Sequence, residues 1–471
     1  MPKITINPVT RIEGHAKIDI YLDDRGSVTD TQLHVTQVRG FEKFVEGRPF
    51  YEMPSITARI CGICPISHLL ASAKACDSIM AVTPTDAAIR LRELVHCAQI
   101  VQSHALSFFY LSAPDLLLGF DSEPATRNVF GLLDANPEMA RVGVALRKFG
   151  QETIEALALE RVHPSWIVAG GVNAPLSEAA RDRILAGLPK ARALASRSLE
   201  GFKSLLDGFA DEIAHFGSAA TMYAGLVDRT GTLDWYDGLL QFKDSSGAAV
   251  AKDIPAKDYG MFIGEASQRD SYLKSPYFKP LGYPAGEYRV GPLARLNVCE
   301  RLGTPQADQE LGDFRQRYGP VIHGSFHYHY ARLIELIHGL EKMEWLLARP
   351  EILDTHVQSH ASVNRLEGVG IIEAPRGVLI HHYQVDEKGA IRWANLIVAT
   401  GHNSLAMNRS VGEVARHFVH GDRIQEGMLN RVSAVIRAYD PCLSCSTHAD
   451  GTLALELTLI GSDGTILDHR Q

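Results

Sequence analysis

The chain has 471 residues, of which 45% are hydrophobic, so it is long enough to bury a large core. Its formal net charge of −8 and its scattered Lys and Arg residues argue against a nucleic-acid or anionic-membrane surface. No apolar run reaches the ~18 residues of a membrane span and the first residues lack a signal-peptide core, so we expect a cytoplasmic protein without a membrane span.

The first forty residues predict a small antiparallel sheet. Apolar and polar residues alternate at 3–6, 16–22 and 33–38, and an Asp-Asp-Arg-Gly turn at 23–26 separates two of these runs. The loop between the first two strands is rich in ionisable groups and contains Glu13. A short strand or loop is expected at 39–44, which contains Glu42.

The first of two Cys-x-x-Cys pairs follows, as Cys61-Gly-Ile-Cys64. Pro65 fits the first turn of a helix running toward residue 77, with His68 one turn further on. Both sulfurs would then lie at a helix N-terminus, where the dipole and free N–H groups favour the thiolate form.

Helices are expected to dominate the next third of the chain. A capping box with Pro at its first helical position, residues 83–86, precedes a segment that is apolar on nearly all faces, so 86–112 predicts a central buried helix. A second helix is predicted from Asn136-Pro137 to about 159. Ser177 predicts the start of a helical hairpin to about 215, broken at Gly187-Leu-Pro189.

The second half alternates between mixed and helical patterns. Residues 220–300 are interpreted as a mixed excursion, with a hairpin near 243–248. Further on, the pattern predicts helices within 306–348, strands at 378–386 and 391–399, and helices at about 403–419 and 423–438. The last helix leads to the second pair, Cys442-Leu-Ser-Cys445, and residues 449–471 show the alternation of a hairpin.

The two cysteine pairs, if they meet, form a four-thiolate site that selects soft or borderline metals: zinc, an iron-sulfur cluster, or nickel and iron. Zinc modules usually separate such pairs by ~12–20 residues, far fewer than lie between Cys64 and Cys442. A thioredoxin-like dithiol needs only one pair in a strand-helix context. The other cysteines, Cys76, Cys97 and Cys299, lack ligand spacing and are interpreted as core residues.

Polar residues beside the pairs favour catalysis over a closed structural site. Arg59 precedes Cys61, Asp440 precedes Cys442, and His448 follows Cys445. Since the pairs must cooperate and no linker divides the chain, we predict one domain with both termini meeting at the metal site. The fold class is mainly α with small peripheral sheets around a central buried helix bundle.

Six motifs along the chain carry a resemblance to a known family. They are Arg11-Ile-Glu13-Gly-His15, Arg39-Gly-Phe-Glu42, Arg59-x-Cys61-Gly-x-Cys64-x-x-x-His68, Gly170-Gly-Val172, Glu373-Ala-Pro-Arg376-Gly377 and Asp440-Pro-Cys442-x-x-Cys445-x-x-His448. Together they resemble the large, catalytic subunit of nickel-iron hydrogenases over essentially the full chain. Four more are most like the soluble, bidirectional NAD-linked branch: Phe41-Glu-Lys-Phe44, Gln102-Ser-His-Ala-Leu106, Gly291-Pro-Leu-Ala-Arg295 and Ile380-His-His-Tyr383.

The resemblance implies reversible heterolytic cleavage of H2 at a nickel-iron centre. Cys61 and Cys442 would be terminal nickel ligands, and Cys64 and Cys445 would bridge nickel to iron. The iron would carry CO and cyanide. Arg376 and Thr400 would donate hydrogen bonds to cyanide, although Ala399-Thr400 stands here where family members often carry Pro-Thr.

The remaining implied roles concern protons, charge and a second metal. Glu13 would carry protons from Cys442, and His68 would lie among the catalytic groups. Asp115 and Asp440 would hold Arg376 over the open bimetallic position. Glu42 and His448 would bind a structural Mg²⁺.

The resemblance also implies processing and partners. A maturation endopeptidase would cut after His448 and remove the extension 449–471 from the domain 1–448. Because the chain has no spare cysteine set and no G-x-G-x-x-G motif between strand and helix, electrons would be carried by an iron-sulfur small subunit together with separate flavin/NAD diaphorase subunits. The alternatives are a non-catalytic scaffold or electron-transfer subunit of the complex I type, and a structural metal protein with four cysteine ligands.

Overall fold

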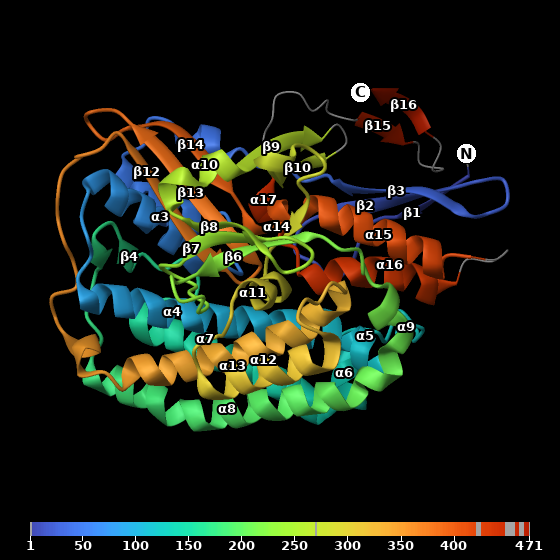
Figure 1. Cartoon of the computed structure of the whole chain (residues 1–471), viewed down its shortest axis with the longest axis horizontal. Coiled ribbons are helices and arrows are strands. Elements are labelled where there is room, and N and C mark those ends of the chain that lie inside the picture. Colours follow the sequence, from blue (N-terminus) through green and yellow to red (C-terminus); the bar gives the residue numbers. More distant parts are fainter. Residues whose placement is uncertain (1, 269–270, 421–424, 448–456, 461–465, 471) are drawn as a thin grey trace.

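The computed structural model describes residues 2–268, 271–420 and 425–447, and the backbone of two strands at 457–460 and 466–470. Long helices form the body and small sheets lie against it, which confirms the predicted fold class (Figure 1). No helix among the described residues is long and apolar enough to cross a membrane.

The central helix is α4 (Asp86–Ala105), which is buried along almost its whole length. The Thr85 hydroxyl accepts a hydrogen bond from the Ala88 N–H and caps it, so Pro84 precedes the cap instead of starting the helix. Beyond Ala105 the chain continues through a π-helical segment, Leu106–Ser112, into α5 (Ala113–Leu118). Two long helices, α7 (Pro137–Ala158) and α13 (Tyr328–Leu347), pack against α4, and the long helix α8 (Glu178–Leu205) packs against both of them (Figure 1).

Helix α8 runs straight through Pro189, so the predicted break there is wrong. A proline inside a helix removes one backbone hydrogen bond and costs about 3 kcal/mol. The buried residues Ile184, Leu188, Ala191 and Ala195 continue one apolar face across it, against α7 and α13. Burial on both sides of the proline therefore outweighs the local cost.

The predicted N-terminal sheet is confirmed, with strands β1 (Lys3–Ile6), β2 (Ala16–Leu22) and β3 (Val28–Val35) paired antiparallel in that order. The next segment differs from the prediction, because Phe41–Phe44 form the short helix α1. The first cysteine pair leads into α3 (Pro65–Met80), as predicted.

The segment 220–300, predicted as a mixed excursion, contains both strands and short helices. It forms the sheet β11-β6-β7-β8, and buried residues of that sheet share one hydrophobic cluster with β12 (Glu367–Ala374), β13 (Gly377–Val385) and β14 (Ile391–Ile397). The strands of the segment 220–300 are β6 (Met222–Val227), β7 (Leu239–Lys243), β8 (Ala249–Ile254), β9 (Ile263–Gln268), β10 (Ser271–Phe278) and β11 (Tyr288–Arg289), of which β9 and β10 pair in a sheet of their own. The segment ends in the helix α11 (Pro292–Val298).

The remaining elements connect these parts. The helices are α2 (Met53–Ala58), α6 (Val129–Ala135), α9 (Ala210–His215), α10 (Tyr259–Phe262), α12 (Pro305–Tyr318), α14 (Ala399–His402), α15 (Ser404–Phe418), α16 (Glu426–Tyr439) and α17 (Leu443–Ser446). The strands are β4 (Ile167–Val168), β5 (Gly171–Val172), β15 (Leu457–Ile460) and β16 (Ile466–Arg470), the last two paired as the predicted hairpin.

The two ends of the chain meet at the second cysteine motif. The Leu443 N–H donates to the Glu13 carbonyl at 3.0 Å, and Glu13 pairs with Cys442 as a parallel β-bridge. Gly14 has φ +89°, and a Cβ there would lie 2.8 Å from Leu443 Cβ. Only glycine lets the N-terminal loop approach this closely.

Candidate metal centre

The four predicted cysteines converge. Their sulfurs all lie within 4.8 Å of one another, with Cys61 Sγ 3.4 Å and Cys445 Sγ 2.7 Å from Cys442 Sγ. All four side chains are buried and none forms a disulfide. No other described cysteine joins a metal-ligating group, which supports the interpretation of Cys76, Cys97 and Cys299 as core residues.

Neighbouring helices hold the first pair in place. Cys64 caps α3, and its backbone N–H donates to Cys61 Sγ at 3.2 Å. The Ile63 carbonyl accepts hydrogen bonds from Gln99 and Gln102 of α4 at 2.8 and 2.7 Å. The loop between the two cysteines is thus fixed from the side of the central helix.

The second pair is placed by a sharp turn after α16. Asp440 ends that helix in the left-handed conformation, with φ 55°, and Cys442 directly precedes α17. The Cys442 N–H donates to Thr400 Oγ1 at 2.9 Å. The predicted residue Thr400 therefore lies at the site, and its own hydroxyl proton remains available to an acceptor.

Glu13 lies beside Cys442, as expected for a group that takes protons from it. Glu13 Oε2 accepts from Cys442 Sγ at 3.1 Å and from the Ser444 N–H at 3.1 Å, while the Ser444 hydroxyl donates to Oε1. The Glu13 side chain is half-buried, so it connects the buried sulfurs with the outer part of the molecule.

The electrostatics of the sulfurs suit a bound cation. Hydrogen bonding from Cys442, Cys445 and Cys61 lowers the pKa of Cys64 well below its usual value. Burial, reinforced by the neighbouring sulfurs, raises the pKa of Cys442 well above its usual value. The protein alone thus does not stabilise four adjacent thiolates, whereas bound metal cations would. The residues present fit a soft metal centre.

Arg376 brings a positive charge to the cluster, at the turn between β12 and β13. It is buried, and its Nε donates to the Asp440 carbonyl at 2.6 Å while Nη2 lies 3.2 Å from both Asp440 carboxylate oxygens. Burial opposes its charge, but Asp440 and the sulfurs raise the pKa of Arg376 well above its usual value. Burial raises the pKa of the Asp440 carboxyl, and Arg376 and Arg332 oppose that rise.

The expectation that Asp115 also holds Arg376 is wrong. Asp115 accepts from Arg11 at 2.5 Å and from Asn430 at 3.0 Å, and it forms an ion pair with Arg437 at 3.0 Å. Burial alone would raise its pKa, but Arg437 and Arg11 lower the pKa of the Asp115 carboxyl below its ordinary value. The third contact of Arg376 is instead Ser103, whose Oγ lies 3.4 Å from Nη1.

His68 lies beside Cys64. Its Nδ1 is 3.1 Å from His381 Nε2, and His381 Nδ1 is 2.6 Å from the Tyr383 hydroxyl. His68 Nε2 is buried without a hydrogen-bond partner among the described residues, while its ring contributes to lowering the pKa of Cys64. An orphaned ring nitrogen beside Cys64 has an acceptor when that sulfur is a metal-bound thiolate.

The structure describes one of the two residues assigned to Mg²⁺. Glu42 is half-buried and accepts from the Leu396 N–H at 3.3 Å. His448 lies outside the described residues. Arg59, expected to join the polar residues near the sulfurs, has an exposed side chain.

Three residues that contact the site occur in the sequence only as parts of longer motifs. Ser444 lies inside the second cysteine motif, Ser103 inside Gln102-Ser-His, and His381 inside Ile380-His-His-Tyr383. Their partners, Glu13, Arg376 and His68, lie far away in the sequence and come close only in the fold.

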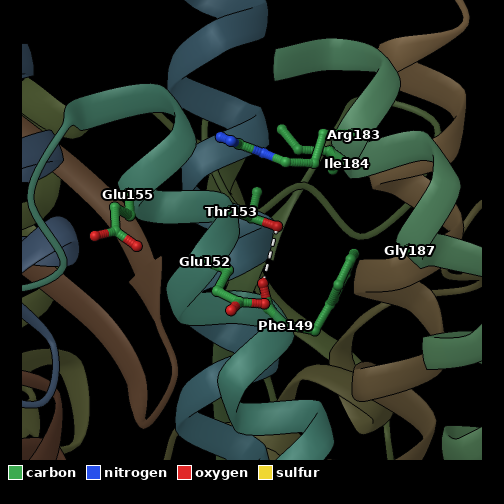
Figure 2. Close-up of a pocket in the computed structure, with 7 residues that line it drawn as sticks. All are labelled: Phe149, Glu152, Thr153, Glu155, Arg183, Ile184 and Gly187. Atoms are coloured by element: carbon green, nitrogen blue, oxygen red, sulfur yellow. Dashed lines mark hydrogen bonds between the residues drawn. The ribbon is translucent and has the colours of Figure 1, made fainter. Parts of the chain in front are cut away.

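A separate surface pocket lies between α7 and α8 (Figure 2). Its lining includes Phe149, Glu152, Thr153 and Arg183. The Thr153 hydroxyl donates to the Phe149 carbonyl of its own helix at 3.0 Å. None of the lining residues is a predicted site residue, so this pocket is unrelated to the sulfur cluster.

Comparison with protein families gives two matches. A family described as nickel-dependent hydrogenase matches residues 39–120 and 224–448, and a HoxL-like family matches residues 3–38. The first match includes all four converging cysteines.

Curated relatives are similar over nearly the whole chain. The NAD-reducing hydrogenase HoxS subunit beta of Cupriavidus necator is 42% identical, over 99% of both chains. One chain of the vhu F420-non-reducing hydrogenase of Methanococcus voltae is also 42% identical, over 88% of this chain and 98% of the relative.

Solved structures agree. An NAD⁺-reducing [NiFe]-hydrogenase in the H2-reduced state superposes with a TM-score of 0.93 at 44% identity, covering 95% of this chain and all of that one. The Ni-Fe-Se hydrogenase of Desulfovibrio vulgaris Hildenborough, at 24% identity and a TM-score of 0.72, shares the fold.

Proposed function

Because this chain belongs to the nickel-dependent hydrogenase family, we propose that its four converging cysteines hold a nickel-iron centre that cleaves H2 reversibly into protons and electrons. The chain is a hydrogenase subunit, homologous to the large, catalytic subunit of NAD-reducing nickel-iron hydrogenase. The convergence of the four sulfurs beside the Glu13 carboxylate carries the proposal.

In this proposal the cysteines divide between two metals. Cys61 and Cys442 would hold nickel, and Cys64 and Cys445 would hold both nickel and an iron that would carry CO and cyanide. When bound, the metal pair supplies the Lewis acidity for heterolytic H2 cleavage. The short mutual distances of the sulfurs and the burial of their side chains support this assignment.

Glu13 acts as the proton relay. Its Oε2 lies within hydrogen-bond distance of Cys442 Sγ, so it accepts a proton released at that sulfur. The contacts from the Ser444 N–H and hydroxyl hold the carboxylate in this orientation. Its half-buried position suits a group that passes the proton outward.

Arg376 and Thr400 supply the polar groups of an otherwise buried pocket. Asp440 orients the Arg376 guanidinium, and the Thr400 hydroxyl is fixed by the Cys442 N–H. Both side chains are nearly inaccessible to water. Their remaining donors suit the nitrogen of cyanide on iron, and Arg376 extends over the open position of the centre.

We further propose a structural Mg²⁺ bound by Glu42 and His448, since carboxylate oxygen suits this hard cation. The domain 1–448 would become mature when an endopeptidase cuts after His448 and removes residues 449–471. The complex would be cytoplasmic.

Electrons leave through a partner in this proposal. The described cysteines form one metal-ligating group, so an iron-sulfur small subunit must accept the electrons and pass them to flavin/NAD subunits. A surface for the small subunit lies close to the proposed centre. Leu159 and Val162 are exposed there. The neighbouring His163 Nε2 is 2.9 Å from the Cys61 carbonyl oxygen. Exposed apolar side chains are typical of such an interface.

Metal analysis of the matured complex tests the function. We expect one nickel and one iron per chain, infrared bands from CO and cyanide, and H2-dependent reduction of an electron acceptor. Zinc as the bound metal, without these bands, would support the alternative of a structural site with four cysteine ligands. A complex that folds fully without bound metal and shows no H2 activity would support the alternative of a non-catalytic scaffold subunit.

A further inference from the structure

Arg295 of α11 uses every N–H donor of its guanidinium. Nε and Nη2 donate to the two carboxylate oxygens of Glu335, both at 2.6 Å, and Nη1 donates to Glu373 Oε2 at 2.8 Å. The two remaining donors go to backbone carbonyls, Nη1 to Ala374 at 2.9 Å and Nη2 to Pro375 at 3.1 Å. The side chain is fully buried.

Those two carbonyls belong to the residues directly before Arg376. Ala374 ends β12 and Gly377 begins β13, so Pro375 and Arg376 form a tight two-residue turn. Arg295 therefore holds, by hydrogen bonds, the two carbonyls just before Arg376, whose side chain extends toward Asp440.

A second contact joins the same two segments. Gly291, which precedes α11, has φ +93°, and a Cβ there would lie 2.7 Å from the Arg376 carbonyl oxygen. Gly377 has φ +132°, and a Cβ there would lie 2.7 Å from the Gly291 nitrogen. Glycine at both positions lets the start of α11 lie against the turn, so Arg295 meets a backbone that is already in place.

The two carboxylates that bind Arg295 are themselves hydrogen-bonded to other elements of the core. Glu335 belongs to α13 and also accepts from His104 Nε2 of α4 at 2.8 Å, and Glu373 Oε1 accepts from the Leu226 N–H of β6 at 2.8 Å. Arg295, Glu335 and Glu373 have no exposed side-chain surface. A fully hydrogen-bonded network of buried charges is rigid, because any displacement leaves a charge without a partner.

We infer that Arg295 is a positioning residue that fixes the Pro375-Arg376 turn and thereby sets where the Arg376 guanidinium lies beside the sulfur cluster. This inference rests on the proposed function and assigns a role to the Gly291-Pro-Leu-Ala-Arg295 motif. Arg295 itself contacts none of the four cysteines. Its effect on the reaction passes through Arg376.

The geometry requires arginine specifically. Its planar fork pairs with Glu335 in a bidentate manner while the other edge reaches Glu373 and two carbonyls. A lysine has one nitrogen with three donors, so Arg295→Lys keeps the charge and gives up contacts to the turn.

The test compares Arg295→Lys with Arg92→Lys in the purified complex. Arg92 is a matched control, because it is equally buried and donates to Asp77 and to the carbonyls of Gly171 and Val168. Each variant is made alone and in an Arg376→Lys background, and kcat for H2 oxidation is measured per bound nickel, together with the infrared bands and the melting temperature.

We expect Arg295→Lys to lower kcat per nickel by about 10- to 100-fold and to shift the infrared bands, because a small misplacement of a catalytic group has effects of this size. In the Arg376→Lys background it should change kcat by less than about twofold, since acting through Arg376 makes the two changes non-additive. Arg92→Lys should lower the melting temperature and leave kcat per nickel and the bands unchanged.

Three results would overturn the inference: equal kcat losses in both backgrounds, an unchanged kcat in Arg295→Lys, or a loss of the same size in Arg92→Lys. If Arg295→Lys does not fold, Glu335→Gln takes its place, because it loosens Arg295 and leaves the guanidinium present. A wild-type complex without nickel or H2 activity would reject the proposed function itself, and this outcome is distinguishable from the failure of Arg295 to act through Arg376.

Discussion

The carboxylate of Glu13 lies 3.1 Å from the sulfur of Cys442, although 429 positions of sequence separate the two residues. The contact exists because the loop after β1 crosses the start of α17, where the Leu443 N–H donates to the Glu13 carbonyl. The N-terminal end of the domain therefore completes the site that the C-terminal motif begins. In the proposed function, proton transfer and metal binding would depend on the same junction.

Replacing Glu13 tests its role in proton transfer. Glu13→Gln keeps the size of the side chain and its contact with the Ser444 N–H, but it removes the base beside Cys442. We expect H2 oxidation to fall by about 10²-fold or more, the size of a lost general base, with nickel and iron contents unchanged. Glu13→Asp, which retains the carboxylate further from the sulfur, should lose less. Full activity in Glu13→Gln would contradict the relay.

Gly14 tests whether the junction itself is essential. A Cβ at Gly14 would meet Leu443 Cβ at 2.8 Å and the Ser444 nitrogen at 2.9 Å. Gly26 is a matched control, because its φ of +78° is similar and a Cβ there meets nothing within 4 Å. Gly26→Ala should cost about 1 kcal/mol of unfolding free energy. Gly14→Ala should cost about 3 kcal/mol and also reduce the nickel content.

Equal losses of stability in the two glycine variants, measured by urea unfolding, would show that only the backbone conformation matters. Normal nickel binding in Gly14→Ala would show that the centre does not depend on the contact between the N-terminal loop and α17.

The buried cysteines outside the cluster provide a contrast with those inside it. Cys64→Ser should abolish iron and nickel retention, because a hydroxyl is a poor ligand for soft metals. Burial raises the pKa of Cys97 to about 12, so this sulfur stays a neutral thiol in the core. Cys97→Ala should cost about 1–2 kcal/mol of stability and leave the metal content per folded chain unchanged. Metal loss in Cys97→Ala would contradict the division of the cysteines into two classes.

Stability should fall in acid. Burial lowers the pKa of several histidines far below their ordinary value: to about 3 for His96, His329, His338 and His402, and to about 4 for His104. The unfolded chain binds protons at these residues below a pH of about 6.5, whereas the folded chain does not. Stability is therefore present above about pH 6.5 and is lost as the pH falls toward the folded pKa values, by up to about 1.4 kcal/mol per pH unit for each histidine.

Some buried carboxyls act in the opposite direction, because burial raises the pKa of Glu373, Asp440, Glu93 and Glu287. The pKa of Glu373 rises to about 7, so its stabilising contribution is present below its ordinary pKa and is lost as the pH rises through 7. The histidines with a strongly lowered pKa outnumber these carboxyls. Urea unfolding at pH 5 and pH 7 should show a lower midpoint at pH 5, and equal midpoints would contradict this account.

The sequence predicted the site better than its surroundings. The cysteine pairs, Glu13, Arg376 and Thr400 belong to compact motifs, and each motif keeps its spacing wherever the chain runs. Of the two partners predicted for Arg376, Asp440 contacts it and Asp115 does not. Ser103, a short stretch before Asp115 in the sequence, contacts Arg376 instead. Which of them faces Arg376 depends on the π-helical segment between α4 and α5, which sequence periodicity does not reveal.

In the fold, too, local sequence patterns predicted single elements but not the contacts between distant segments. Alternating residues predicted β1, β2 and β3, and the capping signals at residues 83–86, Asn136 and Ser177 predicted helix starts to within a few residues. The continuity of α8 through Pro189 and the sharing of one core by 220–300 with β12–β14 depend on contacts between distant segments. Local preference does not encode such contacts.

X-ray absorption at the nickel edge of the matured enzyme tests the central claim most directly, with Cys61→Ser and Cys442→Ser as companion samples. The account predicts a nickel bound by sulfur in the wild type, and loss of sulfur ligands whether the substitution is made near the start or near the end of the chain. Nickel surrounded only by nitrogen and oxygen, or a sulfur environment that survives both substitutions, would contradict it.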